Sequence, residues 1–394
     1  STKLGAPRRT EISVDPIRPW DDPERRDLAE LARTFATREI VPHADEWETS
    51  GELPRELHLA AAKVGLIGVG FDPSVGGDGD LIDSLLVTEN FILAGAPTGV
   101  CASLLTHGIA VPHMANTGDE YLLDRFVRPT LAGEKIGSLA ITEPDAGSDV
   151  ANLRTRAVRD GGHYVVNGAK TYITSGVRAD FVTTAVRTGD PGYGGVSLLV
   201  VEKGTPGFTV SRKLDKMGWR SSDTAELSYV DVRVPAENLV GAEGSGFLQI
   251  MTQFATERLG LATQAYAVAQ RCLTLTMDWV RQRETFGRPL SGRQVVRHKI
   301  AEMARQTDVA RRYVREVAVR YLAGEDVITE VAMAKNTAVY ACDFVVNEAV
   351  QLFGGLGYMR ESEVERHYRD ARILGIGGGT NEIMNEIIAK RLLP

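Results

Sequence analysis

The amino-acid sequence predicts an α+β protein in which a helical segment, a block of strands and a second helical segment follow one another. Helical periodicity begins at Pro23 and continues, with short Gly/Pro breaks, to about Gly133. Strand patterns and turn signals then cluster up to about Gly246, after which helical patterns return. Because the strands form one block and do not alternate with helices, the sequence does not predict a parallel βαβ sheet.

The first helical pattern defines the start of the ordered chain. Its apolar residues fall on one face, with Arg and Glu on the other: Leu28, Leu31, Ala32 and Phe35. The preceding segment, 1–22, has no apolar signal core, and we expect it to be a loosely ordered lead-in.

The central block carries short-range strand signals. Two turn signals, Asp160-Gly161-Gly162 and Asn167-Gly168, separate β-rich runs. The run "VSLLVVEK" extends the strand pattern. Period-two spacing then places Val230, Val232 and Val234 on one face of a further strand.

The C-terminal segment contains a long helix and a glycine-rich loop. One continuous apolar stripe predicts the helix, with Gly324 just past its end: Ile300, Met303, Thr307, Ala310, Val314, Val317 and Tyr321. The stretch "GIGGGTNEIMNEIIAKRLL" then runs from a loop into a last helix whose apolar face carries Ile383, Ile387 and Ile388. The run Gly377–Gly379 would bring backbone close to a ligand, although glycine supplies no chemistry of its own.

Composition restricts the functional class. The 394 residues are 43% apolar and 25% charged, which is typical of a globular protein of two or three domains. A net charge of −7 argues against a nucleic-acid surface, and no apolar run of about 18 residues predicts a membrane span. The three widely spaced cysteines and the histidines show no metal-ligand spacing, so we expect no metal site and a reducing, cytoplasmic location.

The stretch "AITEPDAGSDV", residues 140–150, is dense in small residues, hydroxyls and carboxylates. Taken alone, it is best interpreted as a surface turn, since Pro, Asp, Gly and Ser all favour turns. The functional alternative is a backbone cradle in which exposed N–H groups and the hydroxyls of Thr142 and Ser148 face a polar ligand.

The motifs in combination favour the functional alternative. "TEPDAGSD", "NGAKTYITSG", "RETFGRPL", "QLFGGLGY" and "GGGTNEI" together resemble the acyl-CoA dehydrogenase family, from roughly Glu24 to the C-terminus. The resemblance implies an N-terminal helical domain (23–135), a central β-barrel or sandwich (136–246) and a C-terminal four-helix bundle (247–394). It also implies an FAD enzyme of fatty-acid β-oxidation, a homotetramer built as a dimer of dimers, that converts an acyl-CoA to the trans-2-enoyl-CoA. Its electrons would pass to an electron-transferring flavoprotein.

The resemblance carries cofactor contacts onto matched positions of this chain. Segments beside the flavin correspond to Leu139, Ala140, Ile141, Thr142, Ser148, Tyr172, Ile173 and Thr174. Residues that reach the FAD of a neighbouring subunit, or its diphosphate and adenosine, correspond to Arg283, Thr285, Phe286, Gln294, Gln351, Leu352, Phe353, Gly354, Gly355, Thr380, Asn381 and Glu382. Substrate contacts correspond to Ser148, Phe254, Ala255, Thr256, Arg258 and Gly379.

The position of the general base differs between branches of the family. In the short- and medium-chain branches of the family a Glu precedes the final Gly-Thr, whereas this chain has Gly378 there. The long-chain and isovaleryl branches place the base on the first helix of the C-terminal domain, and Glu257-Arg258 matches their Glu-Arg pair. Met251, Phe254, Gly260 and Leu261 surround Glu257 at helical spacing, as a base of raised pKa requires. A glycine at 378 also avoids crowding a base that arrives from the opposite side, so we predict Glu257 as the base.

Several alternatives remain open. A Glu on a helix is far more often a solvated or salt-bridged residue than a catalyst, and Arg258 can equally be a surface residue. "GGTNEI" and "SDTAEL" favour a long straight-chain acyl-CoA, but a branched short acyl-CoA of the isovaleryl type also fits the position of the base. A flavin oxidase or monooxygenase on the same fold is a rival, as is a non-catalytic scaffold or nucleic-acid-binding relative, which the acidic composition disfavours.

Overall fold

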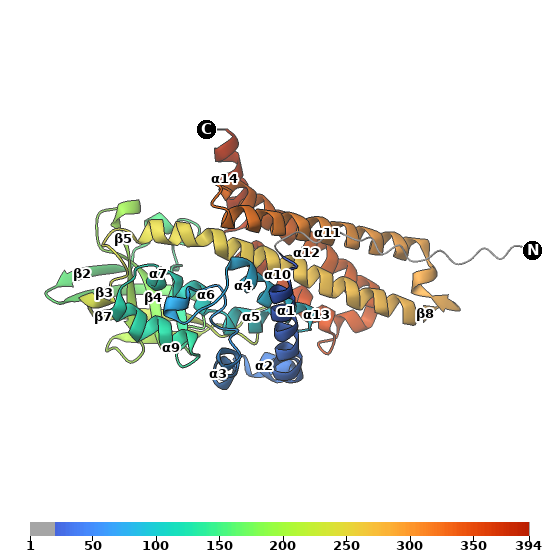
Figure 1. The fold of residues 1–394 in the computed structure, drawn as a ribbon, viewed down its shortest axis with the longest axis horizontal. Helices are drawn as coiled ribbons and strands as arrows, with labels where there is room; N and C mark the ends of the chain where they lie inside the picture. Colours follow the sequence, from blue (N-terminus) through green and yellow to red (C-terminus); the bar gives the residue numbers. More distant parts are fainter. Residues whose placement is uncertain (1–19, 394) are drawn as a thin grey trace, which may run out of the picture.

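The computed structural model describes residues 20–393. Most of the predicted lead-in therefore lies outside the described residues. Three regions follow one another along the chain, and Figure 1 shows the sheet at one end, the N-terminal helices packed beneath, and long C-terminal helices running to the other end. This order confirms the predicted α–β–α organisation.

The N-terminal region is built from helices that bury a shared core. The first, α1, begins at Pro23 behind the N-cap Asp22, whose side chain accepts from the Arg25 N–H. It buries Ala32 and Phe35 as predicted, whereas Leu31 of the predicted apolar face is exposed. The helices of this region are α1 (Pro23–Phe35), α2 (Ala44–Ser50), α3 (Glu56–Lys63), α4 (Leu81–Leu93), α5 (Thr98–Leu104), α6 (His107–Ala110), α7 (Pro112–Ala115), α8 (Glu120–Leu122) and α9 (Arg128–Leu131).

The central region is one curled, mixed sheet with its own core. Its strands run in the order β1-β4-β2-β3-β7-β6, with β5 paired antiparallel to β4. The strands are β1 (Gly137–Ala140), β2 (Arg156–Asp160), β3 (His163–Thr174), β4 (Phe181–Arg187), β5 (Val196–Glu202), β6 (Phe208–Lys213) and β7 (Thr224–Pro235). The Asp160-Gly161-Gly162 turn is confirmed between β2 and β3.

Two details of the strand prediction are wrong. Asn167-Gly168 is not a turn but part of β3, opposite a bulge in β7 where Val230 and Asp231 together face Asn167; the Asn167 side chain exchanges hydrogen bonds with Asp231. The same irregularity places Asp231 at φ +50°. The alternation on β7 therefore changes phase, so that Val230 is exposed while Val232 and Val234 are buried.

The C-terminal region consists of three long helices and two shorter ones. The predicted stripe on α11 is confirmed, because Met303, Thr307, Ala310, Val314 and Val317 are buried. The elements are α10 (Gly246–Gln282), β8 (Glu284–Thr285), β9 (Arg288–Pro289), α11 (Gln294–Leu322), α12 (Ile328–Phe353), α13 (Glu363–Ala371) and α14 (Asn381–Leu392). In Figure 1, α14 projects away from the body of the molecule.

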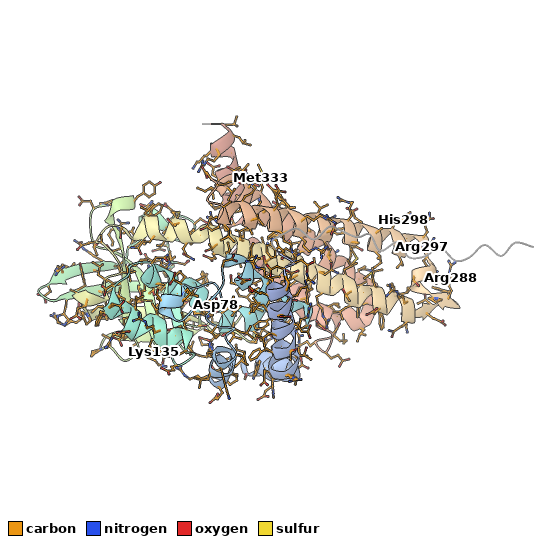
Figure 2. The ribbon with its side chains drawn as sticks, viewed as in Figure 1. Asp78, Lys135, Arg288, Arg297, His298 and Met333 are labelled. Carbon is orange, nitrogen blue, oxygen red and sulfur yellow. The ribbon has the colours of Figure 1, made fainter. Side chains whose placement is uncertain are left out.

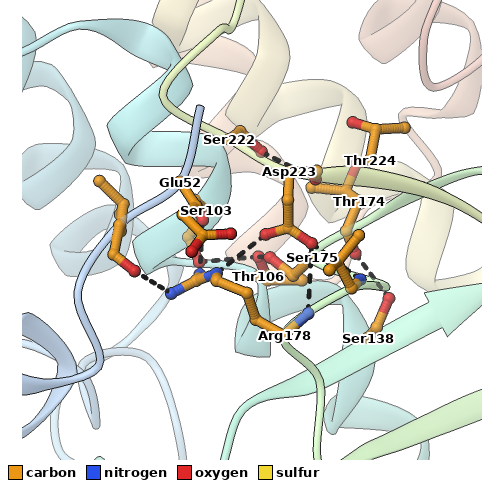
Figure 3. Close-up of polar contacts among 12 residues, drawn as sticks. Glu52, Ser103, Thr106, Ser138, Thr174, Ser175, Arg178, Ser222, Asp223 and Thr224 are labelled. Atoms are coloured by element: carbon orange, nitrogen blue, oxygen red, sulfur yellow. Dashed lines mark hydrogen bonds and ion pairs between the residues drawn. The ribbon is translucent and has the colours of Figure 1, made fainter. Parts of the chain in front are cut away.

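A buried ion pair joins the N-terminal helices to the sheet. Arg178, in the β3–β4 loop, donates from Nε to Asp223 Oδ1 at 2.8 Å, and both side chains are almost wholly buried. Its remaining guanidinium nitrogens donate to the Leu53 carbonyl at 2.8 Å and to Ser103 Oγ at 2.6 Å. Figure 3 shows Arg178 between Asp223 and Ser103. The arrangement fixes how the helices sit against the strands that carry part of the candidate site.

Replacing Asp223 with Ala should therefore be strongly destabilising. The substitution leaves Arg178 as an unpaired buried charge, which costs about 3–5 kcal/mol in comparable cases. Differential scanning calorimetry would measure the fall in Tm. The matched control is Asp160→Ala, which removes an exposed pair with Arg233 and should shift the Tm far less. Equal losses in the two variants would contradict the role given to the buried pair.

Candidate active site

A cavity of about 1600 Å³ lies where the three regions meet. Its walls come from the N-terminal helices, from the ends of β1 and β3, from α10, and from the glycine run before α14. Pockets for a single drug-sized ligand are about 300–1,000 Å³. The cavity therefore has room for more than one ligand or for a cofactor together with a substrate.

The position of α10 is set by its first residue. A Cβ atom on Gly246 would lie 2.7–3.0 Å from the backbone of Ser197 on β5, so only glycine fits. The Gly244 N–H also donates to Ser197 Oγ at 2.8 Å. The helix is thus anchored on the sheet, and Glu257 follows about three turns later.

Glu257 presents an unpaired carboxylate to this cavity. It is half-buried and lines the wall. Among residues 20–393, none forms a hydrogen bond or ion pair with it, and Arg258 donates elsewhere. Burial raises the pKa of Glu257 above its usual value, while the charges of Arg258 and Lys335 act in the opposite direction. Such a group can accept a proton from a ligand.

The glycine run crosses α10 beside this carboxylate. Gly378 has φ +64°, and a Cβ there would lie 2.5 Å from Leu261 Cδ1 and 3.5 Å from Glu257 Oε1. A side chain at 378 is therefore disfavoured twice, by the left-handed backbone and by the contact with Leu261. Glu257 and Gly378, which the sequence analysis linked, lie against one another.

A residue that the sequence analysis missed holds this run in place. Lys335 on α12 is fully buried, and its Nζ donates to the Gly377 carbonyl at 2.7 Å and to the Gly379 carbonyl. Arg258 Nε donates to the intervening Gly378 carbonyl at 3.2 Å. A signal existed in the sequence, because Lys335 stands within the mostly apolar run "VAMAKNTAVYA" and a buried lysine there requires a partner.

The predicted flavin-side residues of the β1 end mostly line the cavity. Leu139, Ile141, Thr142 and Ser148 are in the wall, whereas Ala140 is buried within the sheet. The Thr171 N–H donates to the Thr142 carbonyl at 2.9 Å and fixes the loop against β3. The loop is also anchored beneath, by ion pairing of the buried Glu143 and Lys170 at 2.8 Å.

The end of β3 contributes Tyr172, Ile173 and Thr174 to the cavity. Tyr172 has φ +60° and its side chain is 69% exposed, an unusual combination for an aromatic residue at the end of a strand. Thr174 is fixed through its carbonyl, which accepts from Ser138 Oγ at 2.6 Å. A strained, exposed aromatic side chain in a cavity wall is typical of a ligand contact.

The predicted substrate contacts divide in the same way. Phe254, Thr256, Arg258 and Gly379 line the cavity, whereas Ala255 does not. Of the predicted cofactor contacts at the start of α14, Thr380 lines the cavity, whereas Asn381 and Glu382 do not. The Arg258 guanidinium lies 5.2 Å from the centre of the Phe254 ring. Thr380 caps α14 by accepting from the Ile383 N–H at 3.2 Å.

The remaining predicted cofactor residues lie at the end of the long helices that is far from the cavity. None of these lines the cavity: Arg283, Thr285, Phe286, Gln294, Gln351, Leu352, Phe353, Gly354 and Gly355. Trp279 of α10 joins the helix ends, since its ring stacks on Phe353 at 5.0 Å and its Nε1 donates to the Leu352 carbonyl. Figure 2 shows the basic side chains of Arg288, Arg297 and His298 at this same end.

Two further findings concern residues 20–393. They contain no group of three or more His, Cys, Asp or Glu side chains placed to hold a metal ion. Nor does any helix within that range combine the length and the apolar character needed to cross a membrane.

Comparisons with known proteins agree with the geometry. Models of the acyl-CoA dehydrogenase N-terminal, middle and C-terminal domains match residues 22–134, 138–232 and 244–393. The chain is 37% identical to the long-chain specific acyl-CoA dehydrogenase of Sus scrofa mitochondria, over 99% of this chain and 91% of the relative. It is 35% identical to the mitochondrial isobutyryl-CoA dehydrogenase of Bos taurus, over 99% and 93%.

Solved structures show the same similarity. A structure from Mycobacterium abscessus, described as a probable acyl-CoA dehydrogenase, superposes with a TM-score of 0.94 at 72% identity, covering 95% of this chain and all of that one. The FAD complex of PigA superposes with a TM-score of 0.90 at 28% identity, covering 94% of this chain and 98% of PigA.

The matching models span nearly all the described residues, and the fold confirms the architecture that the sequence resemblance implied. The chain belongs to the acyl-CoA dehydrogenase family of FAD-dependent oxidoreductases that act on acyl-CoA.

Proposed function

We propose that the protein dehydrogenates an acyl-CoA thioester across Cα–Cβ to give the trans-2-enoyl-CoA, with Glu257 as the general base. The observation that carries this proposal is the unpaired Glu257 carboxylate, of raised pKa, in the cavity wall beside Gly378. The α-hydrogen of a thioester is weakly acidic, and its removal requires a base within hydrogen-bond reach. Glu257 takes this proton while the bound FAD supplies the acceptor for the β-hydride.

The chain's own residues would hold the cofactor in two places. Within the cavity, the wall residues Leu139, Ile141, Thr142 and Ser148 and the segment 172–174 offer backbone groups, hydroxyls and the exposed Tyr172 ring. The other predicted contacts lie at the far end of the long helices, where Phe286 is 97% exposed and Arg283 is exposed. We propose that this end serves the FAD of a neighbouring subunit in a homotetramer, a dimer of dimers.

The substrate is the second part of the proposal. We propose a long straight-chain acyl-CoA, in fatty-acid β-oxidation, with a branched short acyl-CoA as the alternative. The similarity to the Sus scrofa long-chain enzyme supports the first, and the similarity to the Bos taurus isobutyryl-CoA enzyme supports the second.

The cellular setting follows from the same reasoning. We propose that electrons leave through an electron-transferring flavoprotein, and that the domains divide at 135/136 and 246/247. The cysteines Cys101, Cys272 and Cys342 are all buried and unpaired. Unpaired thiols support a reducing compartment such as the cytoplasm.

Anaerobic titration with a panel of acyl-CoAs tests the activity directly. Loss of the oxidised flavin's visible absorbance should be rapid with long straight chains, because Glu257 would remove the α-proton of a substrate that fits the cavity. Bleaching by branched short chains alone would move the assignment to the alternative substrate. A flavin that no acyl-CoA bleaches would contradict the proposed function. Rapid reoxidation by O₂ would favour the oxidase rival.

Replacing Glu257 with Gln should lower kcat by about 10²–10⁴-fold, since the amide cannot accept the proton. The wild-type rate should rise with pH through the pKa of Glu257, above the ordinary value of about 4.3, because only the ionised form is a base. The variant should lose this acid limb but retain FAD. Stopped-flow absorbance at several pH values measures both effects.

The matched control is Glu386→Gln, on the exposed surface of α14, which should leave kcat and its pH dependence unchanged. Near-normal turnover in Glu257→Gln would remove the base assignment.

The Gly378→Ala variant should lower both Tm and kcat. A left-handed backbone costs an L-residue about 1–2 kcal/mol, and the added methyl collides with Leu261. The second substitution Leu261→Ala should restore part of the loss by removing the collision. Gly377→Ala is the control for Tm, since the nearest atom to its Cβ is 3.6 Å away. Equal Tm values for Gly378→Ala and Gly377→Ala would contradict the close contact between Gly378 and Leu261 of α10.

A further inference from the structure

All three carbonyls of the glycine run are taken up by two cations. Lys335 Nζ binds the carbonyls of Gly377 and Gly379, and Arg258 Nε binds that of Gly378. Lys335 has no exposed surface and reaches the run from α12, a different helix from the one that carries Glu257. One ammonium group therefore fixes two peptide units on either side of the residue that faces the base.

Peptide geometry then determines where the amide hydrogens point. In a planar trans peptide the N–H is directed opposite to the C=O. Fixing the carbonyls of Gly377 and Gly379 on Lys335 turns the N–H groups of Gly378 and Thr380 away from α12. Neither N–H finds a hydrogen-bond partner in the described part of the chain, and both residues line the cavity. Unpaired backbone donors at a cavity wall favour a ligand oxygen.

The charge of Lys335 also acts on Glu257. Of the titratable groups packed around this carboxylate, Arg258 comes from its own helix and Lys335 from α12, and both favour its ionised form. The glycine run and Leu261 contribute no titratable group. Burial lowers the pKa of Lys335 to about 8, so its ammonium form persists below that pH.

We propose that Lys335 is a positioning residue of the reaction, which aims the N–H groups of Gly378 and Thr380 at the thioester oxygen and places a positive charge beside Glu257. As the α-proton leaves, negative charge develops on that oxygen, and fixed donors stabilise it. Lys335 thus acts on both the base, Glu257, and the N–H donors of Gly378 and Thr380. This inference rests on the proposed function.

Two substitutions separate the contributions of Lys335. Lys335→Met removes both its charge and its hydrogen bonds, whereas Lys335→Arg keeps the charge but cannot place a single nitrogen between two carbonyls. The control is Asn336→Ala, its neighbour on α12, whose Nδ2 donates to the Asn381 carbonyl and to Asn385 Oδ1 without carrying charge. All three proteins are studied with FAD bound.

Infrared difference titration measures the pKa of Glu257 in each variant, with Glu257→Gln as the subtraction reference. Lys335→Met should raise that pKa by about one unit, the smaller end of the effect of an opposite charge at close range. Its kcat should fall at least tenfold with little change in KM. Lys335→Arg should keep the pKa and lose part of kcat, and Asn336→Ala should lower Tm alone.

The inference is overturned if Lys335→Met lowers only Tm, as Asn336→Ala does, and leaves the pKa of Glu257 and kcat unchanged. If Lys335→Met does not fold, the Lys335→Arg variant tests the inference instead. An unchanged kcat in Lys335→Arg would show that Lys335 does not orient the N–H groups of Gly378 and Thr380 for the reaction. Failure of the proposed function is distinguishable, because it would show as normal turnover of Glu257→Gln with Lys335 intact.

Discussion

The close crossing of the glycine run over α10 is the constraint on which the candidate site depends. At Gly378 the two segments approach so closely that a single methyl group would overlap Leu261 and touch the Glu257 carboxylate. A carboxylate could stand on either segment, but not on both. This chain places it on α10, and the absence of a side chain at 378 leaves it facing the cavity without a partner. The absence of a partner, together with burial, gives Glu257 the raised pKa of a base.

The rest of the fold holds the two segments at this crossing. The α10 helix is anchored on β5, where Gly246 leaves no space for a side chain. The glycine run is held by Lys335 from α12, so its position depends on the packing of the helical region. The sheet is joined to the N-terminal helices by the buried pair of Arg178 and Asp223. Each wall of the cavity is therefore fixed by buried polar contacts, which give well-defined geometry when every group is satisfied.

Local sequence patterns correctly predicted the helices and turns that depend on interactions between neighbouring residues. The helical stripe on α11 and the Asp160-Gly161-Gly162 turn follow from periodicity and turn chemistry, and both are confirmed. The prediction of a turn at Asn167-Gly168 is wrong because this pair continues β3 opposite a bulge at Asp231 of β7, and that pairing is far along the chain. The exposure of Val230 follows from that same long-range pairing.

The candidate site was predictable only in part. The family resemblance linked the position of Glu257 on α10 with the absence of a side chain at Gly378. The contact between the two residues depends on the tertiary structure and is visible only there. Lys335 was missed because no short motif contains it, and its partners are backbone carbonyls some forty residues away. Backbone carbonyls carry no sequence signal. The far-end residues, such as Phe286, were predicted through the family resemblance alone, and Phe286 is exposed and lines no part of the cavity.

The most direct test of the central claim is a crystal structure of the FAD-loaded assembly with a non-reactive acyl-CoA analogue. The distance to measure joins the Glu257 carboxylate to the Cα of the acyl group. We expect a distance of about 3–3.5 Å, the separation of a near-attack geometry. A Cα atom well beyond hydrogen-bond reach of Glu257, with another basic side chain nearer to it, would contradict the assignment of Glu257 as the base.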